Sequence, residues 1–204
     1  MTVSAVAICN QALARVAQGP IVNLDDGDRL SRLCKLHYAP KRDALLRDYR
    51  WKFAIARTSL PASATAPVSG WARAYTLPTD CLRVLSAGDM DPEFDPGCSD
   101  KWDREGDAIV TDMAAPLDIR YIRRVSDETR FDPTFVDAFA LYLAMYLAPS
   151  VKELDSGLAA NMRQEFDFVL SRARHTNAIE SRSRQRYRSN SDWVNGRRSY
   201  ARGR

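Results

Sequence analysis

The chain has 204 residues, which is enough for one domain or two small ones. Hydrophobic residues make up 45% of it and charged residues 27%, as in a soluble globular protein. Residues 1–18 lack a basic start and carry polar residues within the apolar run, so we expect no secretory signal peptide.

The net charge of +4 is distributed very unevenly along the chain. Residues 181–204 contain eight arginines and a single acid, Asp192, so this segment carries a charge of +7. The other 180 residues therefore carry a charge of −3. The chain is therefore better described as a mildly acidic body with a strongly basic C-terminal arm than by its average charge.

The four cysteines, Cys9, Cys34, Cys81 and Cys98, form no CxxC pair and lie far apart in the sequence. We expect free, mostly buried thiols in a reducing compartment. No Cys/His pair has the spacing of zinc ligands, so we expect no metal site.

Two helices are expected at the start of the chain. Residues 3–17 place apolar side chains near one stripe and end at a stop signal, Gly19 and Pro20. Residues 28–49 predict a second helix that the preceding acids can cap. Pro40 lies inside it, so either this helix kinks or two shorter helices meet there. Its predicted buried stripe consists of Leu30, Cys34, Tyr38, Leu45 and Tyr49.

From Trp51 onward, the large apolar residues Trp51, Phe53 and Ile55 alternate with lysine and alanine. This two-residue period predicts a strand. A loop rich in Pro, Ser and Ala follows over 59–69. A hairpin with its turn at Gly106 is predicted later in the chain. We expect about five short strands between Trp51 and residue 125. After the loop, the strand-like runs are 71–77, 81–86, 101–111 and 117–125.

The most apolar stretch of the chain is 131–149. Asp132 and Pro133 form a helix-start signal, and Asp137 carries the one charge of the following turns. A helix that is apolar nearly all round is either buried on most sides or spans a membrane. The uncharged run is far shorter than the roughly 20 residues that a membrane span requires. We therefore expect a central core helix that Pro149 ends.

A last helix is expected from residue 153 to residue 175. Its amphipathic stripe consists of Leu154, Leu158, Met162, Phe166 and Val169. The predicted architecture is α+β: a discontinuous helical bundle of residues 1–50 and 128–180, with a small antiparallel β-domain of residues 51–127 inserted in it. The C-terminal arm, 181–204, has too few aliphatic residues to offset its ordering entropy, so we expect it to be flexible or bound to a partner.

The sequence offers little for catalysis. The two histidines, His37 and His175, lie on different predicted helices, and no G-x-S-x-G elbow or glycine-rich phosphate loop is present. Surface or packing roles account for both histidines. We therefore expect no catalytic residue, no cofactor and no enzyme.

An acidic segment resembles a calcium loop in its alternation. An EF-hand loop requires glycine at its sixth position and glutamate at its twelfth, where this chain has Phe94 and Asp100. We therefore expect a solvated acidic loop or an acidic patch that faces a partner. The acids concerned are Asp89, Asp91, Glu93, Asp95 and Asp100.

The arm is the strongest functional signal in the sequence. In one interpretation its arginines contact phosphates and its aromatic residues stack on bases. In another, the arm orders on contact with a protein surface, with Trp and Arg as anchors. A third is a solvated tail, and composition does not separate the first two. The candidate residues are Arg182, Arg184, Arg186, Tyr187, Arg188, Trp193, Arg197, Arg198 and Tyr200.

Four motifs follow one another in a recognisable order. The first is Gly19-Pro-Ile-Val-Asn-Leu24 after the first helix, and the second is Tyr49-Arg-Trp-Lys-Phe-Ala54. The third is Tyr75-Thr-Leu-Pro-Thr-Asp-Cys-Leu-Arg-Val-Leu85. The last is Ile119-Arg-Tyr-Ile-Arg-Arg-Val125, which leads into Phe131-Asp-Pro-Thr-Phe-Val-Asp-Ala138. Residues 1–178 thereby resemble the tail tubular protein A family, the head-to-tail adaptors of short-tailed bacteriophages.

This resemblance implies a structural protein of the virion tail, assembled in the host cytoplasm without a membrane. Such adaptors form a dodecameric ring between the capsid portal and the tail nozzle, and DNA passes along its axis without specific binding. The helical domain would contact the ring and portal, the β-domain the nozzle or tail fibres, and the arm a neighbouring or portal subunit. A mildly acidic body suits a conduit, because a repulsive wall lets DNA slide. The alternative is a nucleic-acid-binding protein that acts through its arginine-rich arm.

Overall fold

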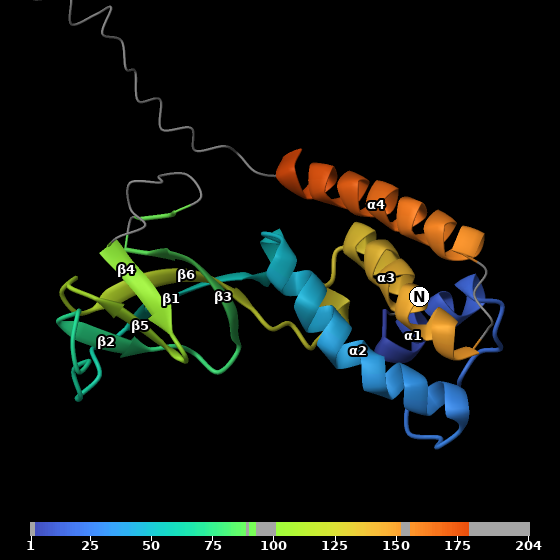
Figure 1. Ribbon diagram of the computed structural model, residues 1–204, viewed down its shortest axis with the longest axis horizontal. Helices are drawn as coiled ribbons and strands as arrows, with labels where there is room; N and C mark the ends of the chain where they lie inside the picture. Colours follow the sequence, from blue (N-terminus) through green and yellow to red (C-terminus); the bar gives the residue numbers. More distant parts are fainter. Residues whose placement is uncertain (1–2, 89, 93–100, 152–155, 180–204) are drawn as a thin grey trace, which may run out of the picture.

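The computed structural model describes residues 3–88, 90–92, 101–151 and 156–179. Within these residues it contains four α-helices and two three-stranded antiparallel sheets. The helices gather at one end of the molecule and the strands at the other (Figure 1). The α+β class predicted from the sequence is therefore confirmed.

The first predicted helix is present as α1 (Ala5–Arg15). Ser4 caps it, because its side chain accepts a hydrogen bond from the amide of Ala7 at 3.2 Å. The helix stops before the predicted signal at Gly19. Ala17 takes a left-handed conformation at φ 55°, a role that glycine fills more often at a helix end.

The second predicted helix is α2 (Arg29–Asp48). Asp28 caps it by accepting from the amides of Leu30 and Ser31 at 3.0 and 3.3 Å. Of the two alternatives raised by Pro40, the structure has a single helix that continues through it. Pro40 lies on the exposed side, where water can bond the carbonyl that has lost its amide partner. The buried side chains of α2 are Ser31, Cys34, Tyr38, Arg42, Leu45 and Leu46.

The segment after α2 is a 3-10 helix, η1 (Lys52–Ala54), and the strand predicted from Trp51 onward begins only at residue 55. Trp51 is fully buried, and its Nε1 donates to the carbonyl of Leu45 at 3.0 Å. The rings of Trp51 and Phe53 meet the ring of Phe135 edge-on, with centroids 5.0 and 5.1 Å away. The alternation therefore reflects aromatic packing into the helical core and not the pleat of a strand.

One sheet contains β1 (Ile55–Leu60), β3 (Cys81–Ala87) and β6 (Leu117–Arg123), in the order β1-β6-β3. Both neighbours pair antiparallel with β6, which lies in the middle. Because β1 continues to Leu60, the loop predicted over 59–69 begins at residue 61.

The other sheet contains β2 (Arg73–Thr76), β4 (Trp102–Glu105) and β5 (Ala108–Thr111), in the order β2-β5-β4. The predicted hairpin is confirmed as β4–β5, and Gly106 in its turn has a φ of 59°, which glycine adopts without strain. The described residues thus contain six strands where about five were expected.

The buried apolar side chains form two clusters. The larger cluster gathers residues from all four helices and takes Leu82, Leu85 and Ile122 from the sheet β1-β6-β3. The smaller cluster lies among the strands and includes Ile119 and Tyr121 of β6. Successive side chains of a strand point to opposite faces, so β6 supplies both clusters.

The apolar stretch forms α3 (Pro133–Val151), which packs against α1, α2 and α4. At its start the carboxylate of Asp132 accepts from the amide of Thr134 at 2.7 Å. The prediction that Pro149 ends this helix is wrong, because the helix continues to Val151. Pro149 is exposed in the last turn, where solvent can replace the hydrogen bond that proline cannot donate.

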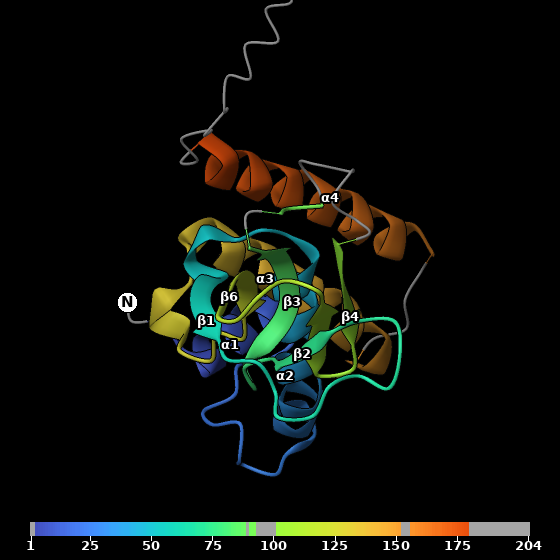
Figure 2. The same cartoon turned by 90° about the vertical axis from the view of Figure 1, so that its left-hand side faces the viewer.

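The last helix is α4 (Ser156–Ile179), which lies along the outer side of α3 in both views (Figures 1 and 2). Met162 is buried and Phe166 and Val169 are half-buried, as the predicted stripe requires. The helix extends four residues beyond the predicted end at His175. Among the described residues, no helix combines the length and apolarity that crossing a bilayer demands. Two members of the predicted stripe lie outside the described side chains: Leu154 and Leu158.

Candidate functional site

The arm residues predicted to bind a partner lie outside the described residues. They are Arg182, Arg184, Arg186, Tyr187, Arg188, Trp193, Arg197, Arg198 and Tyr200. The structure does place the point from which the arm starts, which is the C-terminal end of α4. In Figure 1 this end lies above the junction between the helices and the strands.

The end of α4 is tied to that junction by an amide clamp. The buried side chain of Asn177 accepts from the amide of Lys52 at 2.9 Å and donates to the carbonyl of Arg50 at 3.1 Å. The hydroxyl of Tyr49 donates to the carbonyl of Arg174 at 3.2 Å, and the Arg174 guanidinium lies 5.2 Å from the Tyr49 ring centroid. The root of the arm is therefore held where α2 passes into β1.

A buried ion pair reinforces the same junction. Arg50 donates two hydrogen bonds to the carboxylate of Asp91, at 2.6 and 2.7 Å, and the two side chains are 13% and 15% exposed. Asp91 therefore ties the segment after β3 to the end of α2, although the sequence predicted a solvated loop or a partner patch. The other acids of that segment lie outside the described residues: Asp89, Glu93, Asp95 and Asp100.

An aromatic face lies where α3 meets α2 and α4. Tyr142 stacks on Phe166 of α4 with ring centroids 5.1 Å apart, and its hydroxyl lies 3.3 Å from that of Tyr146. Lys41 of α2 places its Nζ 3.4 Å from the centroid of the Tyr146 ring. Tyr146 remains 37% exposed, so this face combines a covered ring with a solvent-accessible one.

The tyrosine hydroxyls of this face differ in acidity. Burial raises the pKa of Tyr142, and its contact with Tyr146 adds to the shift. The hydrogen bond with Tyr142, followed by the charge of Lys41, lowers the pKa of Tyr146. This face therefore presents a cation and a hydrogen-bonded hydroxyl beside a half-exposed ring.

The histidines do not come together. His37 stacks against Tyr146 at a centroid distance of 6.3 Å, and burial followed by the charge of Lys41 lowers its pKa. His175 is exposed on α4. Cys9 and Cys34 are buried free thiols, as predicted. Cys81 is a half-buried free thiol, and Cys98 lies outside the described residues. The part of the chain that the structure describes holds no group of three or more potential metal ligands.

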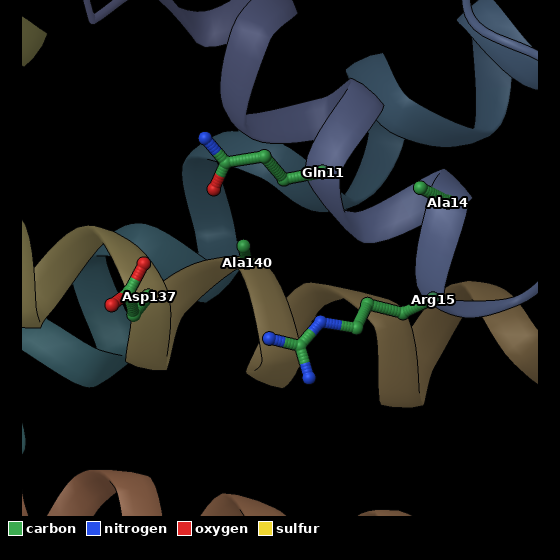
Figure 3. Close-up of a pocket in the computed structure, with 5 residues that line it drawn as sticks. All are labelled: Gln11, Ala14, Arg15, Asp137 and Ala140. Carbon is green, nitrogen blue, oxygen red and sulfur yellow. The ribbon is translucent and has the colours of Figure 1, made fainter.

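A shallow pocket of 310 Å³ lies between α1 and α3 (Figure 3). Two alanines, Ala14 and Ala140, form part of its lining, and Gln11, Arg15 and Asp137 supply polar groups. Arg15 is already paired with Glu165 of α4, so its guanidinium serves contact between helices. The other polar groups of the pocket are the carboxylate of Asp137 and the side-chain amide of Gln11.

The sequence did not predict the contacts of Asn177, Arg50 and Asp91, which fix the junction. Their partners lie 41 or more positions away along the chain, so no local pattern could have marked them. No family model matches this chain, and no curated protein matches it either.

Proposed function

We propose that the protein is a ring-forming adaptor between the capsid portal and the tail nozzle of a short-tailed bacteriophage, and a conduit for DNA during genome ejection. The observation that carries this proposal is the order of the four sequence motifs over residues 1–178. In this proposal the protein is a non-enzymatic component of the virion tail, assembled in the host cytoplasm.

The positions of the motifs support a structural role for them. Trp51 lies in the helical core, and Tyr75 is fully buried with its hydroxyl donating to the carbonyl of Met113 at 2.7 Å. Ile119 of β6 and Phe135 of α3 are also buried. Residues that build the two cores would be shared by proteins of one architecture, whatever their partners.

The separation of helices and strands supports an adaptor with two different ends. We propose that residues 1–50 and 128–180 form one discontinuous helical domain, which contacts neighbouring copies and the portal. Residues 51–127 form the β-domain, which faces the nozzle or the tail fibres. The body carries a charge of −3, which favours sliding of DNA over binding.

The basic arm, residues 181–204, would then dock on a neighbouring copy or on the portal, with Trp193 and Tyr200 as anchors. It would not line the channel, because a charge of +7 from each copy would hold DNA tightly. Its fixed root at Asn177 supports this role, because a tethered arm binds a nearby surface at high effective concentration.

Mass measurement of the purified full chain, alone and mixed with the portal of the same phage, tests the proposal. We expect an assembly of 23.0 kDa chains to form on the portal, with the mass of twelve of them. A chain that stays monomeric and never joins the portal would contradict the adaptor function.

Removal of residues 181–204 tests the arm separately. We expect a folded body that fails to attach to the portal. The nucleic-acid alternative predicts instead that the full chain binds single-stranded DNA with an affinity that falls steeply with salt, and that the truncated chain does not. Normal attachment of the truncated chain to the portal would show that the arm is not the docking element.

A further inference from the structure

Two arginines from opposite parts of the molecule converge on one backbone carbonyl. Arg47 lies in the last turn of α2, and Arg104 lies in the middle of β4. Nη1 of each guanidinium donates to the carbonyl oxygen of Leu82 in β3, and the bond from Arg104 is 3.2 Å long. The helical and strand parts of the chain therefore bring two cations to a single acceptor.

The charges at this carbonyl are not balanced. Within the part of the chain that the structure describes, neither Arg47 nor Arg104 forms an ion pair with a carboxylate. Arg104 makes one other side-chain bond, from Nε to the carbonyl of Gly106 at 3.2 Å. A guanidinium carries five N–H donors, so donors of both arginines remain unused. Arg47 is exposed and Arg104 is half-buried, which leaves the pair open to a ligand from solvent.

The half-buried thiol of Cys81 lies within the field of both guanidiniums. Burial raises the pKa of Cys81, while Arg104 and Arg47 each act to lower it and Asp80 acts to raise it. Arg123 is the partner of Cys81 in the register of β3 and β6, and its Nε is buried without an acceptor. Among the described residues, two guanidiniums and the one carboxylate of Asp80 act on Cys81, and a buried donor on its strand partner lacks an acceptor.

We propose that Arg47 and Arg104 bind a single compact oxyanion, the carboxylate of an acidic residue on a partner protein. Two guanidiniums present forked donors that match the oxygens of such a group. Both guanidiniums meet at one point, which suits a single carboxylate, whereas the phosphates of a polynucleotide need a continuous basic track. The site does not depend on the adaptor function proposed above.

The rate at which Cys81 is alkylated reports whether an oxyanion is bound beside it. Inorganic phosphate serves as the probe anion. An anion bound beside the guanidiniums would weaken their stabilisation of the thiolate, and the thiolate is the reactive form. In the full chain at constant ionic strength, we expect phosphate to slow alkylation of Cys81 by iodoacetamide about threefold, as for a shift of about half a pKa unit. Peptide mass spectrometry separates Cys81 from the other cysteines.

Arg47→Gln and Arg104→Gln should each abolish the effect of phosphate, while Arg32→Gln should preserve it. Arg32 is an exposed arginine about 22 Å upstream on the same helix, so it controls for loss of charge alone. Arg47→Gln changes an exposed side chain and should leave the fold intact. The site can therefore still be tested if Arg104→Gln unfolds the protein. An alkylation rate that is independent of phosphate in the unmodified chain would overturn the site, as would an equal loss in all three variants.

Two further probes identify the source of the oxyanion. Hexaglutamate should slow alkylation of Cys81 in a manner that requires Arg47 and Arg104. A six-nucleotide single-stranded DNA should have no such effect. The opposite result, protection by the oligonucleotide alone, would overturn the assignment to a partner's carboxylate.

Discussion

Two aromatic residues, Trp51 and Tyr49, join the helical part of the molecule to the strands. Trp51 fills the space between α2 and α3 and bonds the carbonyl of Leu45. Tyr49, two residues earlier, reaches the end of α4 through its hydroxyl and its ring. Both residues directly follow the last turn of α2. Their contacts therefore fix the direction in which the chain leaves the helices.

Tyr38 makes stability depend on pH in the alkaline range. It is 6% exposed, and its hydroxyl donates to the Glu128 carboxylate at 3.1 Å. Burial, followed by the charge of Glu128, raises the pKa of Tyr38 above its usual value. Because the folded pKa exceeds the unfolded one, this contribution is fully present below about pH 10 and is lost as pH rises further.

We therefore expect the free energy of unfolding to fall above pH 10, by up to about 1.4 kcal/mol per pH unit from this group. Tyr38→Phe should cost about 1 kcal/mol at pH 7, because Glu128 loses a donor, but should reduce the alkaline slope. Urea denaturation between pH 7 and 11 measures both. A slope unchanged in Tyr38→Phe would contradict this account.

Helix α4 is held in its middle and at its end by different kinds of contact. In the middle, Phe166 stacks on Tyr142 and Glu165 pairs with Arg15 of α1. At its end, Asn177 bonds backbone groups of the α2–β1 junction. Helices with few buried side chains are stable mainly through such tertiary contacts. The position of the arm root thus depends on the Asn177 amide together with the contacts of Tyr49.

Asn177→Ala should loosen the last two turns of α4 without unfolding α1. Two backbone groups lose their partners, so we expect local protection to fall by about 1–3 kcal/mol. Hydrogen exchange of residues 171–179 measures this, with residues 5–15 as the internal reference. Thr176→Ala is the matched control, because the Thr176 hydroxyl bonds only to Arg172 within its own helix. Equal effects of the two substitutions would exclude the clamp.

At the scale of the whole molecule, β6 connects the two buried clusters. Ile122 lies in the cluster that includes the helices, and Ile119 and Tyr121 lie in the cluster among the strands. A strand that belongs to both cannot lose one set of contacts without disturbing the other. The two parts should therefore unfold together.

Ile122→Ala should lower the free energy of unfolding by about 2–5 kcal/mol and shift the helical and aromatic signals together to lower urea. Circular dichroism at 222 nm and tryptophan fluorescence, followed in urea, should give coincident curves. Val68→Ala, at a fully exposed position, should change stability by less than about 0.5 kcal/mol. Separate transitions for the two probes would show that the parts unfold independently.

Much of the fold could be predicted because its signals are local. The cap at Asp28, the turn at Gly106 and the apolar run of α3 each act within a few residues, and each element was found close to its predicted place. The errors also had local causes. Pro149 stays in a helix because it is exposed in the last turn, and Trp51 belongs to the core although its neighbours alternate like a strand.

The candidate sites could be predicted only in part. The arm is visible from composition alone, because charge density needs no fold to be recognised. The convergence of Arg47 and Arg104 on Leu82 could not be seen, because these residues come from α2, β4 and β3 and look like ordinary surface arginines in sequence.

Periodicity, capping and charge are properties of neighbouring residues, so they indicated most of the helices and strands, the apolar central helix and the contrast between an acidic body and a basic arm. Tertiary packing alone brings β6 into two cores, ties Asn177 to the α2–β1 junction and brings two arginines to the carbonyl of Leu82. These contacts join residues far apart in the chain, and the packing of the whole molecule selects them.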